Sequence, residues 1–565
     1  MKTLVIAEKP SVARDIARVL GCAKKENGAL EGNQYIVTWA LGHLVTLKDP
    51  EDYDKKYKEW NMAVLPMMPE KLQIKVIPQT GKQYHAVTTQ LARKDVGEVV
   101  IATDAGREGE LVARWILDKA HNQKPCKRLW ISSVTDKAIR EGFASLKDAK
   151  EYDNLYRAAV SRAEADWLVG INATRALTCK YNAQLSCGRV QTPTLAMIAQ
   201  REQEIREFVP KPYYTVTAAA GGAVYTWKDE KSGGTRISDP EKAKQIAEKA
   251  KRYPLVLQKV GKKKKQKEAP LLYDLTELQR DASARFGYSA KQTLNLMQSL
   301  YETHKVLTYP RTDSRYLTKD IVPTLKERLD AVSIGPYKTL AQQAKRRPLK
   351  EKPGFVNDAK VSDHHAIIPT EQYVQLSALS NEERRIYDLV VRRFLAVLLP
   401  PCVYEETVIQ ASIEKECFTA RGKRMVEKGW QEAYEDNRYD EEDEAKEEVR
   451  EQNLPLLEAG MKIGQPKISL REGKTKPPAR FTEGTLLSAM ENPVRYMENR
   501  DSSLVKTIGE AGGLGTVATR ADIIEKLFRS FLLEKKGNEI YLTSKARQLL
   551  KLVPADLKKP ELTAS

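Results

Sequence analysis

The apolar positions of the first 150 residues follow two alternating spacings. Residues 4–7 form a short apolar run typical of a strand, and residues 12–20 carry apolar positions at helical spacing behind Pro10, which suits a first helical turn. Similar apolar runs lie at residues 35–40, 99–102 and 129–131, with helical patterns after the last two. This rhythm predicts a parallel sheet with covering helices.

The rest of the chain predicts alternating helical and β-rich segments. Helical patterns cover residues 152–207, the region around Tyr309 up to about residue 400, and residues 482–565, whereas β-rich patterns cover residues 212–257 and 403–411. The basic run at residues 262–265 predicts a linker. The acidic stretch at residues 432–451 predicts a solvated loop or an exposed helix.

Length and charge narrow the class of protein. A chain of 565 residues is too long for one hydrophobic core, and at about 100–200 residues per domain we expect three to five domains. Lys and Arg number 94 against 76 Asp and Glu, which gives a net charge of +18. This excess favours a polyanionic partner such as nucleic acid, but a basic solvated surface without a specific partner explains it equally well.

The six cysteines are scattered, and no two of them form a C-x-x-C pair. Structural zinc and a disulfide framework are therefore not expected. No apolar run is long enough to span a bilayer, and the first residues lead into a strand rather than a signal peptide. We expect a cytoplasmic protein that has no membrane partner.

Acidic side chains follow two of the predicted strands. Glu8 ends the first strand, and Asp104 and Glu108 follow the third, while Gly106 and Gly109 let the backbone approach a metal or a phosphate. Because ligands of a parallel sheet bind beyond the carboxyl ends of its strands, we expect these acids to converge on a hard cation, and magnesium is the natural choice. Complementing a helix dipole remains the simpler explanation for any one acid taken alone.

A phosphate-binding loop for ATP is not found at Gly473-Lys474-Thr475. Ile468 stands where the first glycine of the P-loop pattern is required. ATP hydrolysis is therefore not expected, and any bond broken in a nucleic acid would have to be resealed without it.

The segment Tyr309-Pro310-Arg311 places a guanidinium beside a phenol. Pro310 favours extended geometry at Tyr309, so that the side chains of residues 309 and 311 face the same side. Arg311 can then bind phosphate and favour the phenolate of a group whose ordinary pKa is about 10. Attack of this tyrosine on a phosphodiester would give an ester of similar energy, which can be resealed without ATP. Taken alone, Tyr309 would be one of 24 tyrosines packing a core.

These segments resemble motifs of the type IA DNA topoisomerases. Residues 7–11 and 103–110 look like the TOPRIM domain of that family, and residues 309–314 resemble its active-tyrosine motif, with the closer match to the bacterial DNA topoisomerase III branch. One position departs, because Gly106 stands where the family's D-x-D-x-E motif has its second Asp. Glu8 and Asp104 are therefore the expected metal ligands, with Glu108 as a third candidate.

Three further motifs strengthen the resemblance. Residues 186–193 resemble the family's S-x-G-R-V-Q segment, residues 364–370 a topoisomerase III motif, and residues 515–520 another motif of the DNA channel. The candidate DNA-binding residues are Trp60, Arg162, Asp166, Trp167, Arg175, Ser186, Cys187, Gly188, Arg189, Val190, Gln191, Arg311 and Thr519. Arg175 is expected to pair with phosphate and the two tryptophans to stack on bases, although core packing explains either tryptophan at least as well.

The resemblance implies an ATP-independent isomerase with Mg²⁺ as its cofactor. Tyr309 would attack single-stranded DNA and leave a 5′-phosphotyrosyl link and a free 3′-hydroxyl. Glu8 would exchange a proton with the 3′-oxygen, while Lys9 and Arg311 would stabilise charge on the phosphoryl group and His364 would touch the scissile region. Strand passage would relax negative supercoils and decatenate DNA. The implied protein is a monomer located at the nucleoid, with a helicase or a single-strand-binding protein as partner.

The resemblance extends from Leu4 to about Thr563 and implies a torus of mixed α/β, α and β domains. The expected domains are a TOPRIM α/β domain at residues 1–152, a helical DNA-channel domain at 153–211 and 477–565, a β-rich arch domain at 212–277 and 402–476, and a helical domain with the active tyrosine at 278–401. The sequence stops at Ser565, where family members usually continue, so we expect a shortened chain.

Three alternatives stay open at this point. A topoisomerase I would share the machinery and mainly relax supercoils. A TOPRIM nuclease or primase would use the same acids without a tyrosine nucleophile. A non-catalytic DNA-binding protein would form no covalent adduct with DNA.

Overall fold

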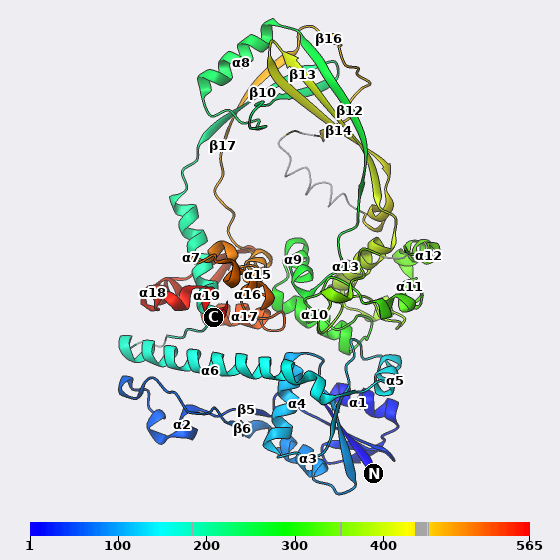
Figure 1. Ribbon diagram of the computed structural model, residues 1–565, viewed down its shortest axis with the longest axis vertical. Helices are drawn as coiled ribbons and strands as arrows, with labels where there is room; N and C mark the ends of the chain where they lie inside the picture. Colours follow the sequence, from blue (N-terminus) through cyan, green and yellow to red (C-terminus); the bar gives the residue numbers. More distant parts are fainter. Residues whose placement is uncertain (183–184, 351–352, 436–448, 450, 565) are drawn as a thin grey trace.

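A seven-stranded sheet between two helical layers forms the N-terminal part of the chain. The computed structural model describes residues 1–182, 185–350, 353–435, 449 and 451–564, and Figure 1 shows this sheet at the bottom. The strand order is β2-β3-β4-β1-β7-β8-β9, in which β1 (Lys2–Ala7), β4 (Tyr35–Trp39), β7 (Val96–Ala102) and β8 (Cys126–Arg128) run parallel. The strands β2 (Lys24–Glu26), β3 (Ala29–Glu31) and β9 (Lys147–Asp148) pair antiparallel at the edges.

Alternate residues of β1 face two separate hydrophobic cores. Leu4 and Ile6 pack on the side of α3 (Gly81–Leu91) and α4 (Arg107–Lys119), while Val5 and Ala7 pack on the side of α1 (Pro10–Leu20) and α5 (Asp136–Ala144). A strand that is buried on both faces needs an unbroken apolar run, which explains the pattern at residues 4–7. The predicted helix start at Pro10 and the first three predicted strands are confirmed.

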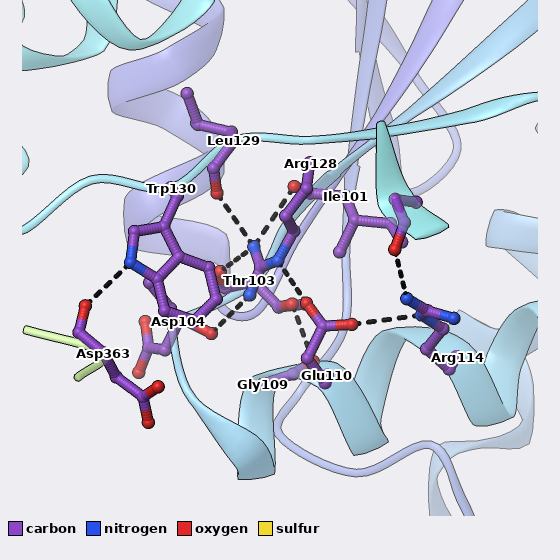
Figure 2. Close-up of polar contacts among 12 residues, drawn as sticks. Ile101, Thr103, Asp104, Gly109, Glu110, Arg114, Arg128, Leu129, Trp130 and Asp363 are labelled. Atoms are coloured by element: carbon purple, nitrogen blue, oxygen red, sulfur yellow. Dashed lines mark hydrogen bonds and ion pairs between the residues drawn. The ribbon is translucent and has the colours of Figure 1, made fainter. Parts of the chain in front are cut away.

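The fourth predicted strand was wrong, because β8 covers residues 126–128 and the apolar run at residues 129–131 lies beyond it. The strand ends on Arg128, whose charge concealed it from a search for apolar runs, although this side chain is only 1% exposed. Figure 2 shows that Arg128 forms an ion pair with the fully buried Glu110 of α4. The guanidinium also donates to the carbonyls of Ile101, Thr103, Asp104 and Leu129.

A long helix leads from the N-terminal sheet into the rest of the chain. The predicted helical region corresponds to α6 (Asp153–Tyr181) and α7 (Gln191–Glu207). The segment that contains α2 (Pro50–Tyr53), between the paired strands β5 (Val45–Leu47) and β6 (Ile74–Val76), packs against α6. There the Asn172 side chain bonds both the N–H and the carbonyl of Met67, at 2.6 and 3.0 Å.

An eight-stranded sheet forms an arch at the far end of the molecule (Figure 1). Its order is β16-β12-β13-β14-β11-β10-β17, with β15 (Glu451–Gln452) paired to β14. The strands are β10 (Pro212–Ala220), β11 (Ala223–Trp227), β12 (Leu255–Lys267), β13 (Cys402–Ile413), β14 (Glu416–Glu427), β16 (Lys462–Ile463) and β17 (Lys467–Lys474). A helix within the predicted β-rich segment, α8 (Pro240–Arg252), covers the sheet. The β-rich prediction is thus confirmed apart from this helix.

The predicted linker at residues 262–265 was also wrong, because these residues lie inside β12. Lys263 and Lys264 stand opposite Glu406 and Glu405 of β13. Opposite charges on facing positions stabilise an antiparallel pair. The run of lysines has no apolar signal of its own, and it is extended because it pairs with β13, whose facing acids lie 143 and 141 positions later in the chain.

Two groups of helices join the arch to the N-terminal sheet and close the chain into a ring (Figure 1). One group contains α9 (Leu275–Phe286), α10 (Ala290–Glu302), α11 (Leu325–Val332), α12 (Lys338–Arg346) and α13 (Asn381–Leu398), which ends just before Pro400 and Pro401. The other contains α7, α15 (Glu483–Glu491), α16 (Ser502–Glu510), α17 (Arg520–Arg529), α18 (Ser544–Leu552) and α19 (Glu561–Ala564). A hairpin of β18 (Leu533–Lys536) and β19 (Glu539–Leu542) interrupts the predicted final helices.

Two expectations concern the surface of the molecule. Residues 436–448 and 450, which hold most of the predicted acidic loop, lie outside the described residues. Within the described ranges, none of the helices has the length and apolar character needed to cross a membrane.

Replacing Glu110 tests how strongly the buried ion pair holds β8. In Glu110→Gln the Arg128 charge stays buried without its carboxylate, and breaking a buried pair from one side costs roughly 3–5 kcal/mol. We expect the first unfolding transition in scanning calorimetry to fall by roughly 5–15 °C. The matched control is Glu98→Gln, because Glu98 pairs with Lys127 at 3.5 Å on the surface, where an ion pair contributes little. Equal shifts in both variants would contradict the prediction.

Candidate active site

Tyr309 lies in a non-helical segment that is held between two other parts of the chain. Leu307, two residues before it, forms an isolated β-bridge with Pro369. The Tyr309 N–H donates to the carbonyl of Ser132, beyond the end of β8, at 2.7 Å. The tyrosine side chain is only 7% exposed. The predicted nucleophile is therefore buried, and the N-terminal sheet region fixes its backbone.

His364 contacts Tyr309 through the face of its ring. The two ring centroids lie 4.2 Å apart, with 28° between the planes. The Nε2 atom of His364 bonds the carbonyl of Ala105, and Nδ1 lies 2.9 Å from the hydroxyl of Ser132. Because a carbonyl only accepts, Nε2 carries the proton and Nδ1 accepts from Ser132. Burial lowers the pKa of His364 to about 3, so the ring is neutral and both of its nitrogens are occupied.

Glu8 and Asp104 form a buried acid pair at the ends of β1 and β7. The Asp104 N–H donates to Glu8 Oε1 at 3.3 Å. Burial raises the pKa of Glu8 well above its usual value, with repulsion from Asp104 as the next cause, and burial likewise raises the pKa of Asp104. A Cβ atom at Gly109 would overlap the Asp104 carbonyl, so glycine is required for α4 to approach this closely. Two such adjoining carboxyls favour a proton or a cation between them.

Arg311 faces Tyr309 and the acid pair with an unused donor. Its Nε atom is buried and has no hydrogen-bond partner in the part of the chain that the structure describes. Burial raises the pKa of the Tyr309 phenol well above 10 and Asp104 adds to this effect, whereas the Arg311 charge lowers it. Arg311 thus lowers the pKa of Tyr309, as expected, but burial raises this pKa by more, and Tyr309 is a neutral phenol.

Lys9 is bound to a helix of the other half of the site. Its Nζ atom lies 3.0 Å from Glu302 Oε1 on α10, and Gln298 donates to the same oxygen at 2.6 Å. Lys9 is not among the residues that line the cavity around Tyr309. Glu302 could not be identified as a partner of Lys9 from the sequence, because the two residues lie 293 positions apart.

A small cavity of about 120 Å³ brings most of the predicted catalytic residues together. It is lined by residues from the N-terminal sheet, α6, the Tyr309 segment and the region before α17. The charged and aromatic residues among them are Glu8, Asp104, Arg107, Glu108, Arg162, Tyr309, Arg311, Asp313, Asp363, His364, Glu491 and Arg520.

The three acids predicted as metal ligands all line this cavity, but Glu108 also contacts another side chain. The Glu108 carboxylate turns to His43, with 3.5 Å between Oε2 and Nε2, and this contact lowers the pKa of Glu108. Within the described ranges, no group of three or more His, Cys, Asp or Glu side chains is arranged to hold a metal ion. Glu8 and Asp104 nevertheless fit Mg²⁺, because this ion is often held by one or two carboxylates together with phosphate oxygens.

A groove of about 760 Å³ borders the cavity and contains most of the predicted DNA-binding residues. Arg162 lines both the groove and the cavity. Burial and the like charges of Arg107 and Arg189 lower the pKa of Arg162 to about 10, which leaves it charged at neutral pH. Arg189 contacts Asp166 at 2.9 Å. The predicted residues in the groove are Arg162, Asp166, Trp167, Ser186, Cys187, Gly188, Arg189, Val190, Gln191 and Thr519.

Three predicted DNA-binding residues lie outside this groove, namely Arg311, which lines the cavity, and Arg175 and Trp60. Arg175 is buried, donates to the carbonyl of Tyr57 and places its guanidinium carbon 5.1 Å from the ring centre of Trp60. Trp60 is 48% exposed. The structure therefore uses Arg175 to hold the segment before β6, and it does not bring this guanidinium to the groove surface.

Sequence profiles of two families match the chain. The profile described as DNA topoisomerase matches residues 150–565, and the profile described as Toprim domain matches residues 3–134. DNA topoisomerase 3 of Bacillus subtilis is 60% identical over 563 residues, which cover 100% of this chain and 77% of that protein. DNA topoisomerase 3 of Bacillus anthracis has the same identity and coverage.

A solved structure has the same fold. Full-length topoisomerase I from Thermotoga maritima matches with a TM-score of 0.69 and 22% identity, over 99% of this chain and 88% of that chain. At this identity the similarity concerns the fold alone, whereas the profile over residues 150–565 and the 60% identity of the relatives define the family. The chain therefore belongs to the type IA DNA topoisomerases, in the branch of the DNA topoisomerase 3 proteins.

Proposed function

We propose that the chain cleaves one DNA strand with Tyr309 and reseals it without ATP. The observation that carries this proposal is the single cavity that Tyr309, Arg311 and the Glu8–Asp104 pair line together. Arg162 connects this cavity to the groove of predicted DNA-binding residues. A groove with arginines and an aromatic side chain suits a single strand, whose backbone is bound by charge and whose bases stack.

In the proposed cleavage step, the Tyr309 oxygen attacks the phosphorus and displaces the 3′-oxygen, while the phenolic proton passes to the Glu8–Asp104 pair in the same cavity. The product is a 5′-phosphotyrosyl ester of similar energy to the bond that is broken, so resealing needs no ATP. The free Nε of Arg311 donates to the phosphoryl oxygens and stabilises their charge. Lys9 adds a second positive charge when it exchanges Glu302 for phosphate.

The acid pair is suited to the proton transfer of this reaction. Because burial and repulsion raise its pKa, Glu8 keeps its proton at a pH where an exposed carboxyl has lost it. It can donate this proton to the departing 3′-oxygen and take it back when the 3′-hydroxyl attacks the ester. His364 acts through position, since both of its ring nitrogens are occupied and its ring face supports Tyr309.

We assign the metal-binding character of the Toprim domain to Glu8 and Asp104. Their carboxylate oxygens are the ligands that Mg²⁺ prefers. When bound there, the ion supplies positive charge beside the cleaved strand. Gly106 contributes no side-chain ligand, so the protein offers two carboxylates and leaves the remaining positions to water and phosphate.

The comparisons favour a topoisomerase III over the other candidates. The relatives with 60% identity are DNA topoisomerase 3 proteins, whereas the similarity to a topoisomerase I is at 22% identity. A TOPRIM nuclease or primase is not favoured, because the DNA topoisomerase profile extends over residues 150–565 and includes Tyr309. The closed ring suits passage of a second strand through the break, and we propose both relaxation of negative supercoils and decatenation.

We propose that the ring is divided into the four domains expected from the sequence. Two hydrophobic cores support the discontinuous domains, because one draws on residues 216–257 with 409–420 and the other on residues 177–198 with 481–553. The second core also takes in Leu275 of α9 and Ala290 and Leu294 of α10. Trp430 and Tyr434 fall within the proposed arch domain by sequence, but they pack into the core of the helical group around α13. The packing of these two side chains, rather than their position in the sequence, therefore assigns them to the helical group and not to the arch.

Tyr309→Phe should abolish the covalent adduct. The proposed link is at the 5′ side of the break, so wild-type protein should retain a 3′ label of single-stranded DNA on a denaturing gel in the presence of magnesium. Tyr387→Phe is the matched control, because Tyr387 is a fully buried tyrosine of the same helical group. If Tyr309→Phe still cleaves the strand, a metal-dependent nuclease is the better explanation.

Magnesium should bind through the acid pair. Isothermal calorimetry with metal-free protein should show binding to the wild type and none to the Glu8→Gln/Asp104→Asn variant, because both carboxylate charges are gone. Glu491→Gln removes a carboxyl that lines the same cavity and should leave the binding unchanged. Equal binding by the wild type and the double variant would place the ion elsewhere.

Arg162→Ala should weaken binding of single-stranded DNA in a salt-dependent manner. Loss of one phosphate contact should lower the slope of log K against log salt concentration by about 0.7. Fluorescence anisotropy of a labelled oligonucleotide at several salt concentrations measures this slope. Arg157→Ala, an exposed position on the same helix, is the control and should keep the slope of the wild type. An unchanged slope in Arg162→Ala would remove Arg162 from the DNA path.

A further inference from the structure

Four aromatic rings form a continuous row that ends on Tyr309. Tyr152 and Trp130 stack at 4.7 Å with 16° between their planes, Trp130 and His364 at 5.8 Å with 18°, and His364 and Tyr309 at 4.2 Å with 28°. Tyr152 and Trp130 belong to the N-terminal sheet region, whereas His364 and Tyr309 belong to the part that carries the nucleophile. The row therefore crosses the contact between the two halves of the active site.

Trp130 is held on both sides of this contact. Its Nε1–H donates to the carbonyl of Asp363, the residue before His364, at 2.8 Å. Its ring centre lies 5.2 Å from the guanidinium carbon of Arg128. Figure 2 shows that the same guanidinium donates to the carbonyl of Asp104, at 2.7 Å. Arg128 and Trp130 thus link the backbone of Asp104, a proposed metal ligand, to the ring of His364, which contacts Tyr309.

The hydrogen bonds of the Tyr309 and His364 segments to the N-terminal part also cross this contact. The lysine–carboxylate pairs across it fix position less strictly. Lys9 reaches Glu302 at 3.0 Å, and Lys305 reaches Asp15 at 2.7 Å. A lysine ammonium is a point charge on a flexible stem, so such a pair tolerates rotation of the two halves. The stacked Trp130 ring sets the plane of the ring beside it, and its directed N–H donor sets the register of the two halves. Sliding or tilting of the halves breaks the stacking or the hydrogen bond.

We propose that Trp130 is a positioning residue, which sets the plane of His364 and thereby aims Tyr309 at the scissile phosphate when the ring is closed. The proposal rests on the proposed cleavage by Tyr309. After cleavage Tyr309 keeps one DNA end, while the Glu8–Asp104 pair lies on the opposite half, so the break widens when the two halves separate. Separation parts Trp130 from His364, and resealing is possible once the rings have stacked again in register.

The test compares Trp130→Leu with Trp130→Phe in the full chain. The readout is the single-turnover rate of covalent adduct formation on saturating single-stranded DNA, together with the dissociation constant from anisotropy. A nucleophile displaced by about 1 Å can lose about 100-fold in rate, so we expect Trp130→Leu to react roughly 10–100-fold more slowly, with the dissociation constant changed by less than about 2-fold. Trp130→Phe keeps a stacking ring and should restore the rate to within about 3-fold of the wild type.

Tyr35→Leu controls for the general loss of an aromatic pair. Tyr35 packs against Phe143 in the same N-terminal region, at 5.7 Å, and the pair lies away from the cavity. This variant should form the adduct at the wild-type rate. The proposal is overturned if Trp130→Leu also reacts at the wild-type rate, or if Trp130→Phe is as slow as Trp130→Leu. It is also overturned if the rate, DNA affinity and melting temperature of Trp130→Leu fall in proportion. Absence of an adduct with the wild type would instead refute the proposed function.

Discussion

The active site depends on one contact, between the loop that follows β8 and the segments that carry Tyr309 and His364. Ser132 is the centre of this contact, because its carbonyl accepts from the Tyr309 N–H and its hydroxyl bonds His364 Nδ1. The carbonyl of Ala105 occupies the other ring nitrogen of His364. These bonds join the segments of Tyr309 and His364 to the part of the chain that carries the acid pair, and all of these residues line one cavity.

Burial at this contact changes the pKa values of the reactive groups. It raises the pKa of Tyr309 and of both members of the acid pair, so the closed site holds protons on the groups that must later exchange them. Arg311 opposes this effect at Tyr309, but its charge does not outweigh burial. A positive charge bound beside these groups would oppose the effect of burial, because it favours their ionised forms.

The sequence was informative where chemistry is carried by neighbours in the chain. Tyr309 with Arg311, and Glu8 and Asp104 at the ends of apolar runs, could be identified because short segments hold both the reactive group and the reason for its geometry. Strand β8 was misplaced because Arg128 is buried with Glu110, and β12 was missed because its lysines face acids of β13. Ser132, Glu302 and Trp130 left no signal at all, since each acts on a residue more than 150 positions away. The roles of the individual site residues remain predictions.

The construction of the contact also explains how a ring can be both closed and able to open. Its residues meet through a few directed hydrogen bonds, three lysine–carboxylate pairs and one row of rings. Tyr301 and Tyr309 also pack into the core between the N-terminal sheet and α1, whereas the cores of the arch and of the two helical groups lie outside this boundary. Separating stacked rings and ion pairs exposes little apolar surface, and water replaces most of the lost polar contacts. A larger apolar core across the same boundary would resist opening far more strongly. The geometry of the active site is thus set by directed hydrogen bonds and stacked rings, which form again when the ring closes. A large buried apolar surface would instead hold the ring shut and prevent the strand from passing.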